Sequence, residues 1–363
     1  MSFRFGISAG QGSGQGSGQG SGQGSGQGSG QGSGRDAHVG GASSPQLNFA
    51  LAMMGEAVTG NWSPQPDYAS NIVPPRALDL AYLGRERRRI VLFAELAKAI
   101  WITEGERSAS LVLGGATLAT LVTPQSDLLS KQVAYLRSYS DLRADRIAEI
   151  NQQIDDLLSF FGAVGFMNDA AREKTMELLA LTQDFAIMLE MSAKNFCWTP
   201  RPITLEPNVC PIIQTPDHSS FPSGHALEAF AIATVLDRLM SSAPSEGPKA
   251  GMHQRRLPFK IAHRIAVNRT IAGVHFPIDN AAGAVFGIAL GEAIYALGTG
   301  KKPLELQSFA PGHGWLSPEA NPDFLLINFY EEFLQNKVEL DGAHRAKSDL
   351  WAAFWTAAQL EWQ

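Results

Sequence analysis

The sequence has few cysteines, no excess of positive charge and no unbroken apolar run long enough to cross a membrane. Its two cysteines, Cys197 and Cys210, are too few for a disulfide scaffold or a four-ligand zinc site, so two free thiols are expected. The net charge of −6 gives no reason to expect binding to nucleic acid. The longest apolar runs are short (109–122) or interrupted by Glu292 (281–297), so no membrane span is predicted.

The N-terminal region also lacks the features of a folded or exported segment. Residues 1–10 contain no apolar stretch of the kind found in secretory signals, so we expect a soluble, cytoplasmic protein, with export left open in case the N-terminus has been altered. The tetrapeptide QGSG then repeats six times over residues 11–34, which is typical of a flexible coil or of a linker added for expression. We expect a flexible segment over 1–44, a catalytic domain over 45–300 and a helical extension over 301–363.

Helical periodicity dominates the rest of the chain, and alternating strand patterns are nearly absent. Apolar residues recur every three or four positions, which predicts helices over 86–101, 104–122, 126–139, 142–161 and 170–194. Ser126 is expected to cap the third of these helices, and Asn168 or Asp169 the fifth. The prediction is therefore an all-α protein.

Further helices are predicted over 223–240 and 258–266, and from Pro277, which suits a first helical turn, to 297. Three glycines fall four residues apart on the last helix, and they predict a face that allows close helix packing: Gly283, Gly287 and Gly291. The C-terminal tail is rich in aromatic residues and helical over 324–335 and 343–361. It would pack onto the main body or onto a second subunit of a homo-oligomer.

Three short segments carry the candidate chemistry. In the first, Lys194 and Arg201 are seven residues apart, nearly two helical turns, so both cations can project to one side. In the second, Ser223, Gly224 and His225 open a helix, where free N–H groups and the helix dipole favour an anion. Taken alone, the cations are better explained as solvated surface charges, and the second segment is explained equally well as an ordinary helix cap.

The third segment contains Arg269, His275 and Asp279. With Pro277 in a first helical turn, Asp279 can accept the Nδ1–H of His275 and leave Nε2 available as a nucleophile or ligand. A structural His–Asp hydrogen bond would explain the same pair. The combination of all three segments in this order is much more specific than any one of them.

Together the motifs Lys-x6-Arg-Pro, Pro-Ser-Gly-His and Arg-x5-His-x3-Asp resemble one superfamily. It comprises the type 2 phosphatidic acid phosphatases, the bacterial class A acid phosphatases and the vanadium-dependent haloperoxidases. The motifs span about a quarter of the chain, and the resemblance implies the family's all-α helical bundle. One position departs, because Asn268 stands where the family usually has serine, and the role of residue 268 is therefore open.

The resemblance also implies a role for each motif residue. Phosphate or vanadate oxygens would be bound by five residues: Lys194, Arg201, Ser223, Gly224 and Arg269. His275 would bond to the phosphorus or vanadium atom, Asp279 would orient it, and His225 would be the acid–base catalyst. A further histidine, His218, lies five residues before Ser223, an offset at which vanadium bromoperoxidases carry histidine.

Two activities fit such a site. Because of His218 and the expected solubility, we favour a haloperoxidase that uses vanadate on His275 and hydrogen peroxide to oxidise halide, with bromide the favoured halide. The alternative is an acid phosphatase that hydrolyses phosphomonoesters through a phosphohistidine at His275, without a cofactor. The short interval between Arg201 and Ser223 favours this alternative. A third hypothesis is a non-catalytic interaction protein that retains the anion pocket.

Overall fold

The computed structural model describes residues 45–59, 80, 82–168, 170–241, 247–301, 309, 312–334 and 347–363. The predicted flexible segment 1–44 and the capping candidate Asp169 lie outside these residues. The chain divides into two compact units, Met1–Leu92 and Phe93–Gln363, each of which is described by itself. The expected boundaries near residues 44 and 300 remain predictions.

The described part of the first unit is helical. It contains α3 (Pro45–Thr59), whose described side chains are exposed, and the beginning of α4 (Arg85–Ala99), which ends in the second unit. Apolar side chains are among those exposed on α3, such as Phe49 and Met54.

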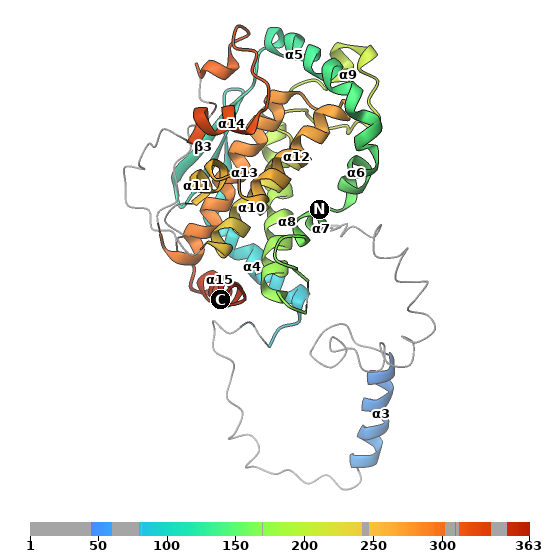
Figure 1. The fold of residues 1–363 in the computed structure, drawn as a ribbon. Helices are drawn as coiled ribbons and strands as arrows, with labels where there is room; N and C mark the ends of the chain where they lie inside the picture. The colour runs from blue at the N-terminus through green and yellow to red at the C-terminus, as the bar shows by residue number, and fades with distance from the viewer. Residues whose placement is uncertain are drawn as a thin grey trace. The chain divides into compact units, whose positions relative to one another are not determined.

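The second unit is a bundle of helices with a small sheet (Figure 1). Its longer helices are α5 (Ser126–Tyr139), α6 (Arg143–Asp155), α8 (Glu173–Phe196), α10 (Gly224–Met240), α12 (Leu257–Ile271), α13 (Pro277–Thr299) and α15 (Asp349–Leu360). Its shorter helices are α7 (Leu158–Gly162), α9 (Pro202–Leu205), α11 (Gly247–His253) and α14 (Leu326–Phe329). The predicted all-α class is confirmed, since the fold is 66% helical.

The core is built around α10, which packs against α8, α12 and α13 (Figure 1). Both α10 and α13 are buried along almost their whole length, as expected for helices that are apolar on every side. The close packing predicted from the α13 glycines is confirmed. A Cβ atom on Gly283 would lie 2.4 Å from the Ser223 carbonyl oxygen, and one on Gly287 would lie 2.4 Å from that of Leu227.

The helix predicted over 104–122 is wrong. This stretch belongs to an antiparallel sheet of order β1-β2-β3, formed by β1 (Ile100–Gly105), β2 (Ser108–Leu113) and β3 (Ala116–Val122). Gly114 and Gly115 both have positive φ, 56° and 95°, which suits the two-residue turn of a hairpin and would interrupt a helix. The apolar spacing therefore matched a helix by coincidence.

The other helix predictions hold with changed ends. The helix predicted over 142–161 is two helices, because the backbone of Asp156 is extended (φ −142°). Ser126 is the first residue of α5 and not its cap, a position that Gln125 occupies without a side-chain hydrogen bond. Asn168 caps the turn that precedes α8, where its Oδ1 accepts from the N–H groups of Ala170 and Ala171.

Candidate active site

The fold brings the three motifs together at one end of α10. Lys194 lies in the last turn of α8, Arg201 precedes α9, and Ser223 is the N-cap of α10. The third motif joins the end of α12, which carries Arg269, to the start of α13. The Ser223 N–H donates to the Asp279 carbonyl oxygen at 2.9 Å, which ties the second motif to the third.

The hydrogen bonds of His275 orient its ring as the expected role of nucleophile requires. Its Nδ1 lies 3.2 Å from Asp279 Oδ2, and its Nε2 lies 3.0 Å from Arg201 Nη1. Because a guanidinium group only donates, Nε2 must be the acceptor and Nδ1 must carry the proton. Burial is the main cause that lowers the pKa of His275 well below its usual value, and the charge of Arg201 adds to it. The ring is therefore neutral, with an unprotonated Nε2.

Asp279 is an anchored carboxylate. Its Oδ2 accepts from Ser220 Oγ at 2.6 Å and from the Phe276 N–H at 2.9 Å, in addition to His275. Burial raises the pKa of Asp279 to about 6, against the opposing effect of these hydrogen bonds. This carboxyl group therefore changes charge near pH 6.

Arg201 links the nucleophile to the preceding loop. Its Nη1 also donates to the Val274 carbonyl at 3.0 Å, and its Nη2 lies 3.1 Å from His218 Nδ1. His218 therefore does lie at the site, half-buried against the guanidinium group. Burial is the main cause that lowers the pKa of His218, and the charges of Lys194 and Arg201 add to it.

Lys194 is almost completely buried beside the second motif. Its Nζ donates to the carbonyl oxygens of Pro222 at 2.6 Å and Ser219 at 3.2 Å. Burial lowers the pKa of Lys194 to about 8, although Glu190 favours the charged form. These hydrogen bonds hold the segment that precedes Ser223 against α8.

Several polar atoms in this region are buried without a hydrogen-bond partner among the described residues. They are Ser223 Oγ, Arg269 Nε and Nη1, Glu190 Oε2 and Asp279 Oδ1. Buried polar atoms are nearly always paired in proteins, so a cluster of unpaired donors marks a place prepared for a ligand. The donors come from the residues that the motifs assign to an oxyanion.

His225 and Arg269 are both held by Gln153 of α6. The His225 Nε2–H donates to the Gln153 carbonyl oxygen at 2.9 Å, and Arg269 Nη2 donates to Gln153 Oε1 at 3.0 Å. Burial is the main cause that lowers the pKa of His225 to about 3, with the charge of Arg269 second. Asn268 also donates to Gln153 Oε1, at 3.0 Å, so residue 268 holds the partner of Arg269.

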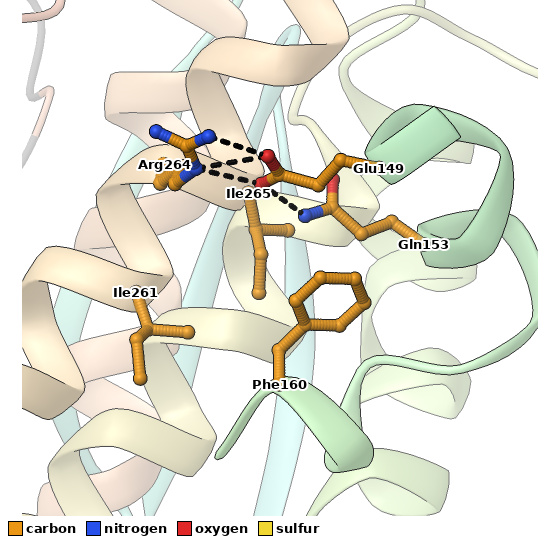
Figure 2. Close-up of a pocket in the computed structure, with 6 residues that line it drawn as sticks. All are labelled: Glu149, Gln153, Phe160, Ile261, Arg264 and Ile265. Atoms are coloured by element: carbon orange, nitrogen blue, oxygen red, sulfur yellow. Dashed lines mark hydrogen bonds and ion pairs between the residues drawn. The ribbon is translucent and has the colours of Figure 1, made fainter. Parts of the chain in front are cut away.

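Gln153 and Glu149 also line a pocket of about 240 Å³ between α6, α7 and α12 (Figure 2). Phe160, Ile261 and Ile265 form its apolar wall, as Figure 2 shows. Arg264 closes the polar side with hydrogen bonds to Glu149 of 2.7 and 2.9 Å.

Three residues at the site belong to none of the sequence motifs: Gln153, Glu190 and Glu228. Glu190 stands one helical turn before Lys194, and Glu228 one turn after Gly224, so helical spacing from the motifs would have found both. Burial is the main cause that raises the pKa of each carboxyl group, that of Glu228 to about 8. Gln153 has no such signal, because α6 reaches the site only through the tertiary fold.

Comparison with known proteins matches the part of the chain that contains these motifs. Residues 177–302 fit the family model of the PAP2 superfamily. This region is similar to the PAP2 superfamily. The match covers every predicted site residue from Lys194 to Asp279, and members of the superfamily are usually phosphatases or related enzymes.

Two curated relatives are similar to part of the same region. Both are decaprenylphosphoryl-5-phosphoribose phosphatases, from two strains of Mycobacterium tuberculosis. Each is 29% identical over 96 residues, which is 26% of this chain and 47% of the relative. The chain thus spans about half the length of the curated relatives it matches. These relatives favour the phosphatase alternative, and nothing in the comparisons specifically supports the haloperoxidase.

The expectation of a soluble, cytoplasmic protein is corrected. By their name the relatives act on a compound that carries a decaprenyl lipid chain, and α13 is long and apolar enough to cross a membrane. These findings point to a membrane protein rather than a soluble one. The predicted absence of a membrane span is not confirmed. Glu292, which interrupts the apolar run, is paired inside the protein with Arg238 at 2.8 and 2.7 Å. In the described structure, the apolar window of α13 is completely buried by protein.

Proposed function

We propose that this chain is a phosphatase that hydrolyses a phosphomonoester through a phosphohistidine at His275. The observation that carries the proposal is the state of His275, which is neutral, oriented by Asp279 and unprotonated at Nε2. The unpaired donors of Ser223 and Arg269 supply the binding site for the phosphate oxygens. Because the relatives' name describes a phosphate on a lipid-linked ribose, a lipid-linked phosphomonoester is the substrate class to test first.

The first chemical step forms the P–N bond and breaks the P–O bond to the alcohol. Nε2 of His275 attacks phosphorus while Lys194, Arg201 and Arg269 neutralise the charge on the oxygens. His225 gives a proton to the departing alkoxide. Although its pKa is about 3 in the ligand-free protein, a bound phosphate dianion favours the imidazolium form. Since the Gln153 carbonyl holds the Nε2–H of His225, Nδ1 is the atom that exchanges the proton.

The second step regenerates the enzyme. Water attacks the phosphohistidine, the P–N bond breaks, and the electron pair returns to Nε2 of His275. Neutral His225 accepts a proton from the attacking water, so that inorganic phosphate leaves and both histidines are reset. Asp279 stabilises His275 in both steps, because its carboxylate accepts the Nδ1–H.

A vanadium haloperoxidase is the second candidate, and the contact between His218 and Arg201 is the observation that favours it. The unpaired donors fit vanadate as well as phosphate, because both are tetrahedral oxyanions. Lys194, Arg201 and Arg269 would hold its oxygens, and His275 would be its ligand. When bound, vanadate supplies the activation of hydrogen peroxide needed to oxidise a halide.

A paired assay of one preparation distinguishes the two candidates. We expect p-nitrophenyl phosphate to be hydrolysed without vanadate, and orthovanadate and phosphate to inhibit competitively. Halogenation of monochlorodimedone with vanadate, peroxide and bromide should stay at the background rate. Halogenation without hydrolysis would select the haloperoxidase, and failure to bind either oxyanion in calorimetry would contradict both.

The variant His275→Ala tests the proposed nucleophile. We expect hydrolysis to fall on the order of 10³-fold or more, because the atom that bonds to phosphorus is removed. Phosphate should still bind, since the cationic donors remain. His253→Ala is the matched control, because His253 is an exposed histidine outside the motifs. Thermal unfolding of both variants checks the fold, and a His275→Ala protein with most of its turnover would exclude the phosphohistidine.

A further inference from the structure

A buried carboxyl group lies against the glycine of the second motif. Glu190 is 7% exposed, and its Oε2 has no hydrogen-bond partner among the described residues. A Cβ atom on Gly224 would lie 2.2 Å from Oε2 and 2.5 Å from Oε1 of this carboxyl group. Residue 224 must therefore be glycine to leave room for Glu190, and the carboxyl group lies at the N-terminal end of α10, where the oxyanion is expected.

Three charged or titratable groups act on Glu190 from the surrounding elements. Lys194 follows it by one turn of α8, Arg201 approaches from the start of α9, and Glu228 belongs to α10. Glu228 has a partner of its own, since its Oε2 accepts from Gln183 Nε2 at 2.8 Å. Oε2 of Glu190 has none among the described residues, although this carboxyl group lies against Gly224 of the Ser-Gly-His motif.

The charge of Glu190 determines what it does to a bound oxyanion. An ionised carboxylate would repel the phosphate and would compete with it for Lys194 and Arg201. A neutral carboxylic acid has one O–H, which can donate to a phosphate oxygen. Burial raises the pKa of Glu190 more than the two cations lower it, and this favours the neutral form.

We propose that Glu190 is an additional oxyanion-binding residue, which donates a hydrogen bond to a substrate oxygen as the neutral carboxylic acid. The inference rests on the proposed phosphatase function and adds a ninth residue to the eight found by motif. It predicts that oxyanion binding takes up a proton when Glu190 is ionised. The affinity for an oxyanion should therefore fall as the pH rises.

Inorganic sulfate is the probe, because it remains a dianion from about pH 5 to about pH 8 and so adds no titration of its own. The dissociation constant of sulfate is measured by calorimetry over this range for the wild type and for Glu190→Gln. Glu190 raises the pKa of Lys194, which is about 8, so Glu190→Gln lowers it, and the two proteins are compared only up to about pH 7, where Lys194 is charged in the wild type. The amide introduced by Glu190→Gln donates at every pH. We therefore expect this variant to gain affinity relative to the wild type as the pH rises toward about 7, with the two proteins converging at low pH.

Glu228→Gln is the matched control, because it changes the neighbouring buried carboxyl group in the same way. Glu228 has a pKa of about 8 and is mostly neutral at lower pH, so the pH dependence should persist in Glu228→Gln. A ratio between Glu190→Gln and wild type that does not change with pH would overturn the proposal. A flat response in Glu228→Gln instead would assign the proton to Glu228 and would overturn it as well.

A measurement on the wild type keeps the test valid if Glu190→Gln fails to fold. Calorimetry of sulfate binding in two buffers of different ionisation enthalpy counts the protons taken up, and between about pH 5 and about pH 7, where Lys194 is charged, uptake should grow as the pH rises. Uptake that does not grow over this range would overturn the proposal. If the wild type binds neither sulfate nor phosphate, the proposed function itself fails, whereas binding and hydrolysis with a flat ratio would contradict only the role of Glu190.

Discussion

In the proposed mechanism, the ionisation of Asp279 determines how the activity depends on pH. Its Oδ2 accepts from three donors, yet burial still raises its pKa to about 6. Above that pH the group is ionised and stabilises the charge that develops on His275. Below it, the group is neutral and this stabilisation is lost.

The variant Asp279→Asn tests this role. We expect kcat/KM of the wild type to rise with pH through about 6, as Asp279 ionises, and the variant to be slower by about 10²-fold or more because it carries no charge. The substrate's own phosphate also titrates near this pH. The measured quantity is therefore the ratio of wild type to variant on the same substrate, in which the substrate's titration cancels. A ratio that stays constant from about pH 5 to about pH 8 would contradict the assignment.

The motif residues were predictable from sequence because their spacing and chemical types are specific. The resemblance assigned roles to Lys194, Arg269 and His275, which stay predictions, and hydrogen bonding then gave the tautomer of His275. Sequence could not find Gln153, because its contacts with His225 and Arg269 depend on where α6 packs. The role of Asn268 was open for the same reason, since its partner Gln153 belongs to another helix.

At the scale of elements, the site depends on how closely α13 approaches α10. Gly283 and Gly287 meet carbonyl oxygens of α10 and its N-cap at the same distance, 2.4 Å from an added Cβ atom. The steric cost of a methyl group should thus be similar at both positions. Only Gly283 faces a motif residue, because its neighbour is the Ser223 carbonyl oxygen.

Gly283→Ala and Gly287→Ala therefore form a matched pair. We expect each to lower the free energy of unfolding by about 1–3 kcal/mol, because overpacking pushes the two helices apart. Only Gly283→Ala should also reduce kcat/KM, by about tenfold or more, since it displaces the residue that caps α10. Chemical denaturation measures the first quantity and p-nitrophenyl phosphate hydrolysis the second. Equal losses of activity in both variants would show that general loosening matters more than the placement of Ser223.

Element boundaries were the weakest part of the sequence prediction. The apolar residues of 104–122 satisfied helical spacing, but Gly114 and Gly115 turn the chain and pair β2 with β3. The starts of α10 and α13 were predicted well, because Ser223 and Pro277 are residue types typical of the first positions of a helix. No capping residue or proline marks the boundary at Asp156. The apolar periodicity continues across it, so one helix was predicted where the structure has two.

At the scale of the whole molecule, apolar side chains are exposed around the first motif. Trp198 is 65% exposed and lies between Lys194 and Arg201 in the sequence, while Met191 and Ile203 on either side are 43% and 37% exposed. Exposed apolar side chains that gather near a binding site often mark a surface that meets a membrane or another protein. Tryptophan in particular favours the interface between lipid and water. A phosphatase of lipid-linked substrates would need such a surface near its site.

We therefore expect the protein to bind vesicles of neutral phosphatidylcholine, and Trp198→Ala to reduce the bound fraction. A loss of about tenfold in affinity corresponds to about 1.4 kcal/mol, a reasonable share of the transfer free energy of one exposed tryptophan. The net charge of −6 makes a neutral lipid the appropriate choice, since it avoids repulsion by an anionic surface. Phe166→Ala is the control, because Phe166 is 88% exposed but lies outside the motifs. Sedimentation with vesicles measures the bound fraction, and an equal loss in both variants would mean that Trp198 has no special part in membrane binding.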